Sequence, residues 1–119
     1  MSITVVTAVL PEYIRFELSG DYSLAELFEF IDQAKSEADS VGRDHLLINT
    51  LGLEGSMSEA DRFMAGRQIA DVFGPRLKAG CIMPAEGITK LGELTADNRG
   101  ARFFVTGTED EALRWLLTS

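Results

Sequence analysis

Apolar and polar residues near the start of the chain are arranged in a way that predicts two strands. Residues 2–10 are rich in β-branched side chains, and a proline ends the run. The next run, residues 13–18, alternates strictly, so that Ile14, Phe16 and Leu18 share one face. Because so short a connection joins the two runs, we expect them to pair as an antiparallel hairpin.

The residues that follow predict an amphipathic helix. Ser23 and Glu26 have the spacing of a capping box, in which the hydroxyl accepts from a free helix N–H and the carboxylate reaches back to the cap. Gly42 suits the C-terminal cap. Between the caps, apolar residues recur every three or four positions and form one stripe facing the core: Leu24, Leu27, Phe28, Ile31, Ala34 and Ala38.

A buried strand and a second helix come next. Residues 45–51 lack polar alternation, which is typical of a strand covered on both faces. In the loop after this strand, two serines compete for the N-cap of the helix. Ser56 forms a capping box with Glu59, and Ser58 is the rival cap. The helix should end at Gly74, which precedes a proline.

The last third of the chain continues to alternate strand and helix. Residues 79–84 and 102–105 have the composition of strands, and residues 87–98 predict a weaker helix with a glycine inside it. Thr108 with Glu111 forms a third capping box and opens a final helix.

The predicted order is β-β-α-β-α-β-α-β-α within a single domain that spans residues 1–119. Strands that alternate with helices need crossover connections and favour a parallel sheet. We therefore expect an α/β fold with a mixed, mostly parallel five-stranded sheet, an antiparallel N-terminal hairpin strand and about four helices. The first strand would lie at a sheet edge, and because residues 3–10 carry no charge, we expect it to pair into a homodimer.

Composition and charge exclude several classes of function. The chain has 11 Lys and Arg against 19 Asp and Glu, a net charge of −8, which argues against a nucleic-acid partner. Residues 1–60 carry the whole imbalance, with 11 acids and 3 bases, so a basic protein partner fits this half better than an acidic one. No apolar run is long enough to span a membrane, and the first residues lack a basic leader, so we expect a cytoplasmic protein.

The chain offers few groups for catalysis or metal binding. It has one cysteine, Cys81, and one histidine, His45. Cys81 lies in an apolar run and is expected to be an inert core thiol, and a zinc site would need about three or four ligands. We therefore expect no metal, no cofactor and no enzyme activity. The alternative is an enzyme that uses Glu54 or Glu59 in proton transfer.

The order of elements and several short phrases resemble the STAS domain, the fold of anti-sigma factor antagonists and of the cytoplasmic tails of sulfate transporters. One phrase is the Leu-Ser-Gly-Asp turn at residues 18–21, and a long loop after the third strand accompanies it. Residues 96–101 (Ala-Asp-Asn-Arg-Gly-Ala) and 111–116 (Glu-Ala-Leu-Arg-Trp-Leu) look more like the stand-alone SpoIIAA-like branch. The resemblance implies successive strands lying side by side with crossover helices between them, akin to the CRAL-TRIO lipid-binding fold.

In an antagonist of this family, the functional residue is a serine in an Asp-Ser-Ser-Gly segment, which a partner kinase phosphorylates. The matching residues here are 55–58, Gly-Ser-Met-Ser, so the resemblance makes Ser56 the phosphorylation candidate, with Ser58 beside it. Gly55 stands in place of the aspartate, and Ser58 in place of the glycine. Both serines also suit the simpler role of helix caps. Three acidic residues near this helix start would repel a phosphate: Glu54, Glu59 and Asp61.

Apolar residues around the same helix start could form a ligand or partner surface. Together with an acidic neighbour, its members are Glu54, Met57, Phe63, Met64, Ile88 and Leu91. We expect a non-enzymatic regulatory or binding module that acts by protein contact or holds a small apolar, lipid-like ligand. The alternative is a phosphorylatable switch at Ser56 or Ser58.

Overall fold

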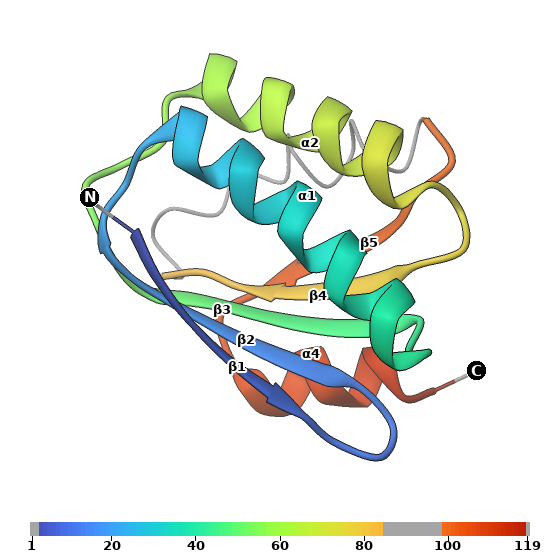
Figure 1. Ribbon diagram of the computed structural model, residues 1–119. Coiled ribbons are helices and arrows are strands. Elements are labelled where there is room, and N and C mark those ends of the chain that lie inside the picture. The colour runs from blue at the N-terminus through green and yellow to red at the C-terminus, as the bar shows by residue number, and fades with distance from the viewer. Residues whose placement is uncertain (1–2, 85–98, 119) are drawn as a thin grey trace.

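A computed structural model describes residues 3–84 and 99–118 (Figure 1). The expected helix at residues 87–98 lies outside these residues, and so do Ile88 and Leu91. The elements in chain order are β1 (Ile3–Val9), β2 (Ile14–Asp21), α1 (Leu24–Val41), β3 (His45–Glu54), α2 (Glu59–Phe73), β4 (Lys78–Ile82), β5 (Arg102–Thr106) and α4 (Glu109–Leu116). The predicted α/β fold is confirmed, with three helices in the described part of the chain.

The five strands form one mixed sheet in the order β1-β2-β3-β4-β5. β1 pairs antiparallel with β2, as the hairpin prediction requires, and every later pair is parallel. Because successive parallel strands lie side by side and crossovers share one hand, the helices between them are expected on a single face. Figure 1 shows this arrangement: α1 and α2 lie over one face, and α4, which follows the last strand, lies under the other.

The main core fills the space between the sheet and the α1–α2 layer. Ile14, Phe16 and Leu18 of β2 are all buried on this face, as their alternation predicts. β3 is covered on both faces, since Leu46 packs in the main core and Leu47 packs with α4. The parallel sheet therefore owes its stability to apolar residues that contact helices on both sides.

The helix caps follow the sequence closely at α1 and α4. The Ser23 hydroxyl accepts from the Glu26 N–H at the start of α1, and Gly42 ends the helix with φ of 71°, in the left-handed region that glycine adopts without strain. Thr108 caps α4 by accepting from the N–H of Glu111. None of the helices in the described ranges is long and apolar enough to cross a membrane.

One large core residue lies outside the predicted apolar stripe of α1. Phe30 is only 3% exposed, and its ring meets Phe16 of β2 edge to face, with ring centroids 5.2 Å apart and planes at 82°. Such T-shaped pairs are favoured by the charge distribution of aromatic rings. Phe28, which belongs to the predicted stripe, is only partly buried, so the helix is rotated slightly toward Phe30.

Candidate functional site

The loop between β3 and α2 lies at the carboxyl end of the parallel strands, where open α/β sheets commonly place their binding sites. Gly55, Ser56, Ser58 and Glu59 are exposed along it, and Met57 is half-buried. Gly55 has φ of 101°, a conformation that disfavours any other residue and turns the chain away from β3. The predicted site residues in this segment are therefore at the surface and close together in the chain.

The N-cap of α2 differs from the capping box first expected. Ser58, not Ser56, is the cap, and its hydroxyl accepts from the N–H of Asp61 at 3.1 Å. The expected box of Ser56 with Glu59 is therefore wrong, while the rival Ser58 is confirmed. The difference follows from where the helix begins: its first residue is Glu59, so Ser58 stands at the N-cap and Ser56 lies two residues before it. Ser56 is left exposed, outside the cap.

Tyr22, just after β2, anchors both ends of this loop. Its N–H donates to the carbonyl oxygen of Glu54 at 2.8 Å, and its hydroxyl donates to Oδ2 of Asp61 at 2.9 Å. Burial and the carboxylate of Asp61 raise the pKa of Tyr22 above its ordinary value. The hydroxyl thus stays protonated as a donor, and Asp61 is committed to an internal bond.

A close approach of β2 and β3 fixes the strand that leads into the loop. The register between the two strands shifts beyond Glu17, and Gly52 lies against β2 at this point. A Cβ at Gly52 would come within 2.8 Å of the Leu18 carbonyl oxygen. The backbone at the end of β3 therefore packs where a side chain would not fit.

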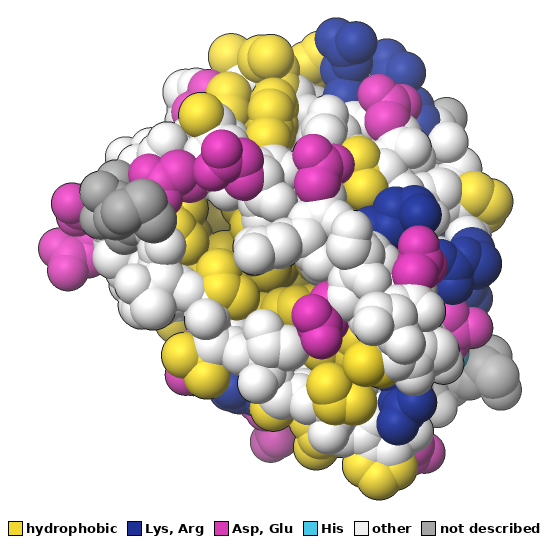
Figure 2. All heavy atoms as spheres, viewed as in Figure 1, with side chains coloured by type: hydrophobic (Ala, Val, Ile, Leu, Met, Phe, Trp, Pro, Cys, Tyr) yellow, Lys and Arg dark blue, Asp and Glu magenta, His cyan; other side chains and the backbone are white. Residues whose placement is uncertain are grey.

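Exposed apolar side chains lie on α2 next to the loop. Phe63 and Met64 are 40% and 42% exposed, and Figure 2 shows apolar side chains gathered on the outer side of this helix. The Arg67 guanidinium lies 5.8 Å from the centroid of the Phe63 ring, within range of a cation–π contact. Nε of Arg62 is buried and has no hydrogen-bond partner. The predicted surface thus combines acidic and apolar groups in the part of the chain that the structure describes.

The acids of the enzyme alternative, Glu54 and Glu59, do not converge with the chain's one histidine. His45 begins β3, whereas Glu54 ends this ten-residue strand, and Nδ1 of His45 lies 2.7 Å from its neighbour Asp44. Glu54 and Glu59 are both exposed to solvent. No cluster of metal-ligating side chains exists among residues 3–84 and 99–118. The geometry therefore gives no support to the enzyme alternative built on these acids.

Cys81 lies in the middle of β4 and is buried in the main core. Burial raises the pKa of its thiol to about 12. A thiol that stays protonated at neutral pH is a poor nucleophile. The prediction that Cys81 lies in the core is confirmed.

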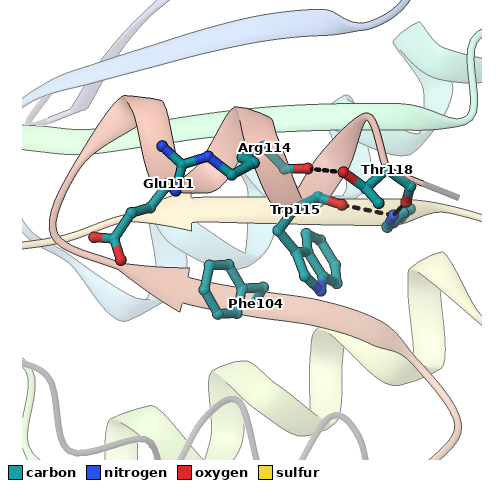
Figure 3. A pocket seen from close by; sticks show the side chains of 6 residues that line it. Phe104, Glu111, Arg114, Trp115 and Thr118 are labelled. Atoms are coloured by element: carbon teal, nitrogen blue, oxygen red, sulfur yellow. Dashed lines mark hydrogen bonds between the residues drawn. The ribbon is translucent and has the colours of Figure 1, made fainter.

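A surface pocket on the α4 face was not predicted from the sequence. It has a volume of about 490 Å³ and is lined by Lys78, Phe104, Glu111, Arg114, Trp115 and Thr118. Figure 3 shows the rings of Phe104 and Trp115 side by side in it, and they stack with centroids 5.2 Å apart. Nζ of Lys78 donates to the carbonyl oxygens of Trp115 and Thr118. The lysine therefore satisfies two carbonyl oxygens at the C-terminal end of α4, a role that the sequence did not indicate.

Two solved structures are similar to this chain over almost its whole length. An anti-sigma factor antagonist from Mycobacterium paratuberculosis has a TM-score of 0.65 at 17% identity, with 98% of this chain and 96% of that chain covered. An uncharacterised protein with a SpoIIAA-like fold from Shewanella loihica has a TM-score of 0.51 at 18% identity, covering 97% and 93%. This chain has a STAS/SpoIIAA-like fold. No family model and no curated protein matches its sequence.

The STAS/SpoIIAA-like fold confirms the resemblance drawn from the sequence. At these identities the likeness concerns the arrangement of strands and helices. The β3–α2 loop joins the third strand of this STAS/SpoIIAA-like sheet to its second helix.

Proposed function

We propose that this chain is a non-enzymatic regulatory module that binds a basic partner protein through its β3–α2 surface. This surface consists of residues 54–61 together with Phe63 and Met64. The observation that carries the proposal is an exposed loop held at both ends by Tyr22, through Glu54 and Asp61. A preorganised loop binds with a smaller loss of conformational entropy than a free one.

The side chains of the β3–α2 surface are of the kinds found in protein interfaces. Phe63 and Met64 supply exposed apolar area, and aromatic residues and methionine are enriched in interface cores. Glu54 and Glu59 supply exposed negative charge in the segment that leads to them. In the described part of the chain, no ion pair involves either carboxylate. A partner with lysine or arginine side chains around an apolar patch would complement both features.

Site-directed photocrosslinking tests the proposal directly. Benzoylphenylalanine replaces the exposed Ser56, and the protein is irradiated in an extract of the cells that express it. We expect one discrete adduct with a basic protein. The adduct should disappear in the Glu54→Lys/Glu59→Lys variant, since charge reversal repels a basic partner.

A matched control places the same crosslinker at Ser36, an exposed residue of α1 away from the loop. The control should give no such adduct. An identical adduct from both positions, or an adduct at Ser56 that survives the charge reversal, would contradict the proposal.

A phosphorylation switch at Ser56 is the second candidate, because Ser56 is exposed and takes no part in the helix cap. A helix N-terminus favours an added anion by about 0.3–1 kcal/mol, while neighbouring carboxylates oppose it. Incubation with ATP and cell extract, followed by intact-mass measurement, should show a gain of one phosphoryl group. The gain should be lost in Ser56→Ala and retained in Ser58→Ala. An unchanged mass would remove this candidate and leave the binding proposal standing.

A further inference from the structure

The outer edge of β1 has a defined set of unused backbone groups. The N–H of Leu10 donates to the Tyr13 carbonyl oxygen at 2.9 Å, so residues of even number point their backbone groups toward β2. The N–H of Ile3 instead donates to Oε1 of Glu26 at 2.9 Å, on the side away from β2. By alternation, the N–H and C=O groups of Val5, Thr7 and Val9 point outward. β1 is the last strand of the sheet on this side among the described residues (Figure 1).

This edge lacks the usual protection against pairing with another strand. Residues 3–10 contain no charged side chain, whereas natural edge strands are commonly blocked by charges, prolines or bulges. Val6 is 58% exposed and Val9 is 47% exposed. Within residues 3–84 and 99–118, the edge is therefore uncharged, mostly apolar and without a neighbouring strand.

We propose that β1 pairs antiparallel with β1 of a second copy of this chain, with Thr7 on the two-fold axis. In this register Thr7 faces the partner's Thr7, and Val5 faces the partner's Val9. All three outward residues then form hydrogen-bonded pairs, each exchanging both bonds. The exposed Val6 lies opposite the partner's Ala8, so that apolar side chains meet on the α4 face as well.

Both ends of this ladder stop without leaving a donor unpaired. Ile3, whose N–H is already bonded to Glu26, lies opposite the partner's Pro11, which has no N–H. A register centred on Val5 would place Ile3 opposite the partner's Thr7. The Ile3 N–H would then be needed for the ladder, although it is already bonded to Glu26. In the register centred on Thr7, the edge of β1 is therefore complementary to the same edge of a second copy. A two-fold contact of this kind closes into a dimer. A second copy therefore fits the edge better than a charged foreign strand.

Molar mass in solution tests the pairing. At micromolar concentration, light scattering after gel filtration should give twice the 13.0 kDa mass of the chain. Thr7→Pro removes one outward N–H and leaves the β1–β2 bonds intact, so this variant should be a folded monomer by circular dichroism. Thr7→Val keeps the N–H and should remain a dimer. A monomeric parent protein, or a dimeric Thr7→Pro variant, would overturn the proposal.

Cysteine crosslinking tests the register. Residues of a hydrogen-bonded antiparallel pair have Cα atoms about 5.5 Å apart, a distance that a disulfide can span. Thr7→Cys should therefore form an intermolecular disulfide in air, and the buried Cys81 does not compete. Thr4→Cys is the control, because the two copies of this residue would lie roughly 20 Å apart along the strands. Equal crosslinking of both variants, or no crosslinking of Thr7→Cys, would exclude this register.

Discussion

The two faces of the sheet are stabilised in different ways. Toward α1 and α2, nineteen buried apolar residues form one continuous cluster in the described part of the chain. Toward α4, the corresponding cluster has four buried members, Leu47, Ile82, Ala112 and Leu116. Polar contacts supplement this smaller cluster: Lys78 bonds the end of α4, and Arg15 of β2 pairs with Glu109 at 2.9 Å.

The difference indicates which part of the molecule is the scaffold and which is an attached layer. The main core lies directly behind the β3–α2 surface. One side of α2 packs in this core, and the first residues of the same helix belong to the surface. α4 is a short helix whose attachment combines a few apolar contacts with hydrogen bonds to charged groups. Substitutions on the two faces should therefore lower the free energy of unfolding by different amounts and change different spectroscopic signals.

The largest effect is expected in the main core. Phe16→Ala should lower the free energy of unfolding by about 3–5 kcal/mol, because it leaves a cavity beside Phe30. Leu47→Ala, on the α4 face, should cost about 2 kcal/mol, the lower end for such truncations. Urea unfolding of both variants measures the difference. A greater cost for Leu47→Ala would contradict the proposed division of the molecule.

The next effect concerns the polar attachment of α4. Lys78→Met keeps most of the side-chain stem but removes the bonds of Nζ to the carbonyl oxygens of Trp115 and Thr118. We expect a loss of about 2 kcal/mol, since hydrogen bonds from charged groups contribute roughly 1.5–3 kcal/mol each and relief of lysine burial offsets part of this.

The protein has a single tryptophan, so its fluorescence reports on this helix. Lys78 lies 4.6 Å from the Trp115 ring centroid, and the emission of Trp115 should shift in Lys78→Met. Arg114→Met is the matched control at an exposed position and should change stability by less than about 0.5 kcal/mol. An unshifted spectrum in Lys78→Met would show that this bond does not hold α4.

A smaller effect is expected at the anchor of the candidate site. Tyr22→Phe removes the hydrogen bond to Asp61 and should cost about 1.5 kcal/mol near neutral pH. The pKa of Tyr22 is raised in the folded protein above its ordinary value of 10.0. The hydroxyl therefore stabilises the fold fully below pH 10.0, and this stabilisation is lost as the pH rises through the folded-state pKa.

Unfolding curves at pH 7 and at pH above 10 distinguish the loss of the Tyr22–Asp61 hydrogen bond from a simple packing effect. The stability gap between the parent protein and Tyr22→Phe should narrow at the higher pH. Ser58→Ala serves as the control, because it removes a hydrogen bond at the same helix start whose acceptor does not titrate, and its stability gap should show no such narrowing. A gap that is constant with pH would mean that the hydroxyl bond does not anchor the loop.

Elements with strong periodicity or a unique cap could be predicted from the sequence, and those that depend on tertiary contacts could not. The alternation of β2 identified its buried face, and Ser23 and Gly42 identified the ends of α1. The burial of Phe30 could not be predicted, because it depends on how α1 rotates over Phe16. The role of Lys78 was also hidden, since its acceptors lie 37 and 40 residues away in the chain.

The candidate site was predicted as a segment but not in its internal geometry. The loop after the third strand and its two serines, Ser56 and Ser58, were expected from the sequence. The anchor from Tyr22 was missed, because it joins residues 39 positions apart. The choice of N-cap was left open between two serines, since both have an acidic residue three positions later.

The choice between Ser56 and Ser58 as N-cap of α2 provides the most selective test, with the smallest expected change in stability. Ser58→Ala should cost about 1 kcal/mol, because it removes the acceptor for the Asp61 N–H at the start of α2. Ser56→Ala should change the free energy of unfolding by less than about 0.5 kcal/mol, since Ser56 is exposed and outside the cap. Thermal or urea unfolding of the two variants in parallel gives the comparison within one loop. If Ser56→Ala were the costlier change, α2 would begin two residues earlier, and Ser56 would be a structural residue that is poorly placed to meet a kinase or a partner protein.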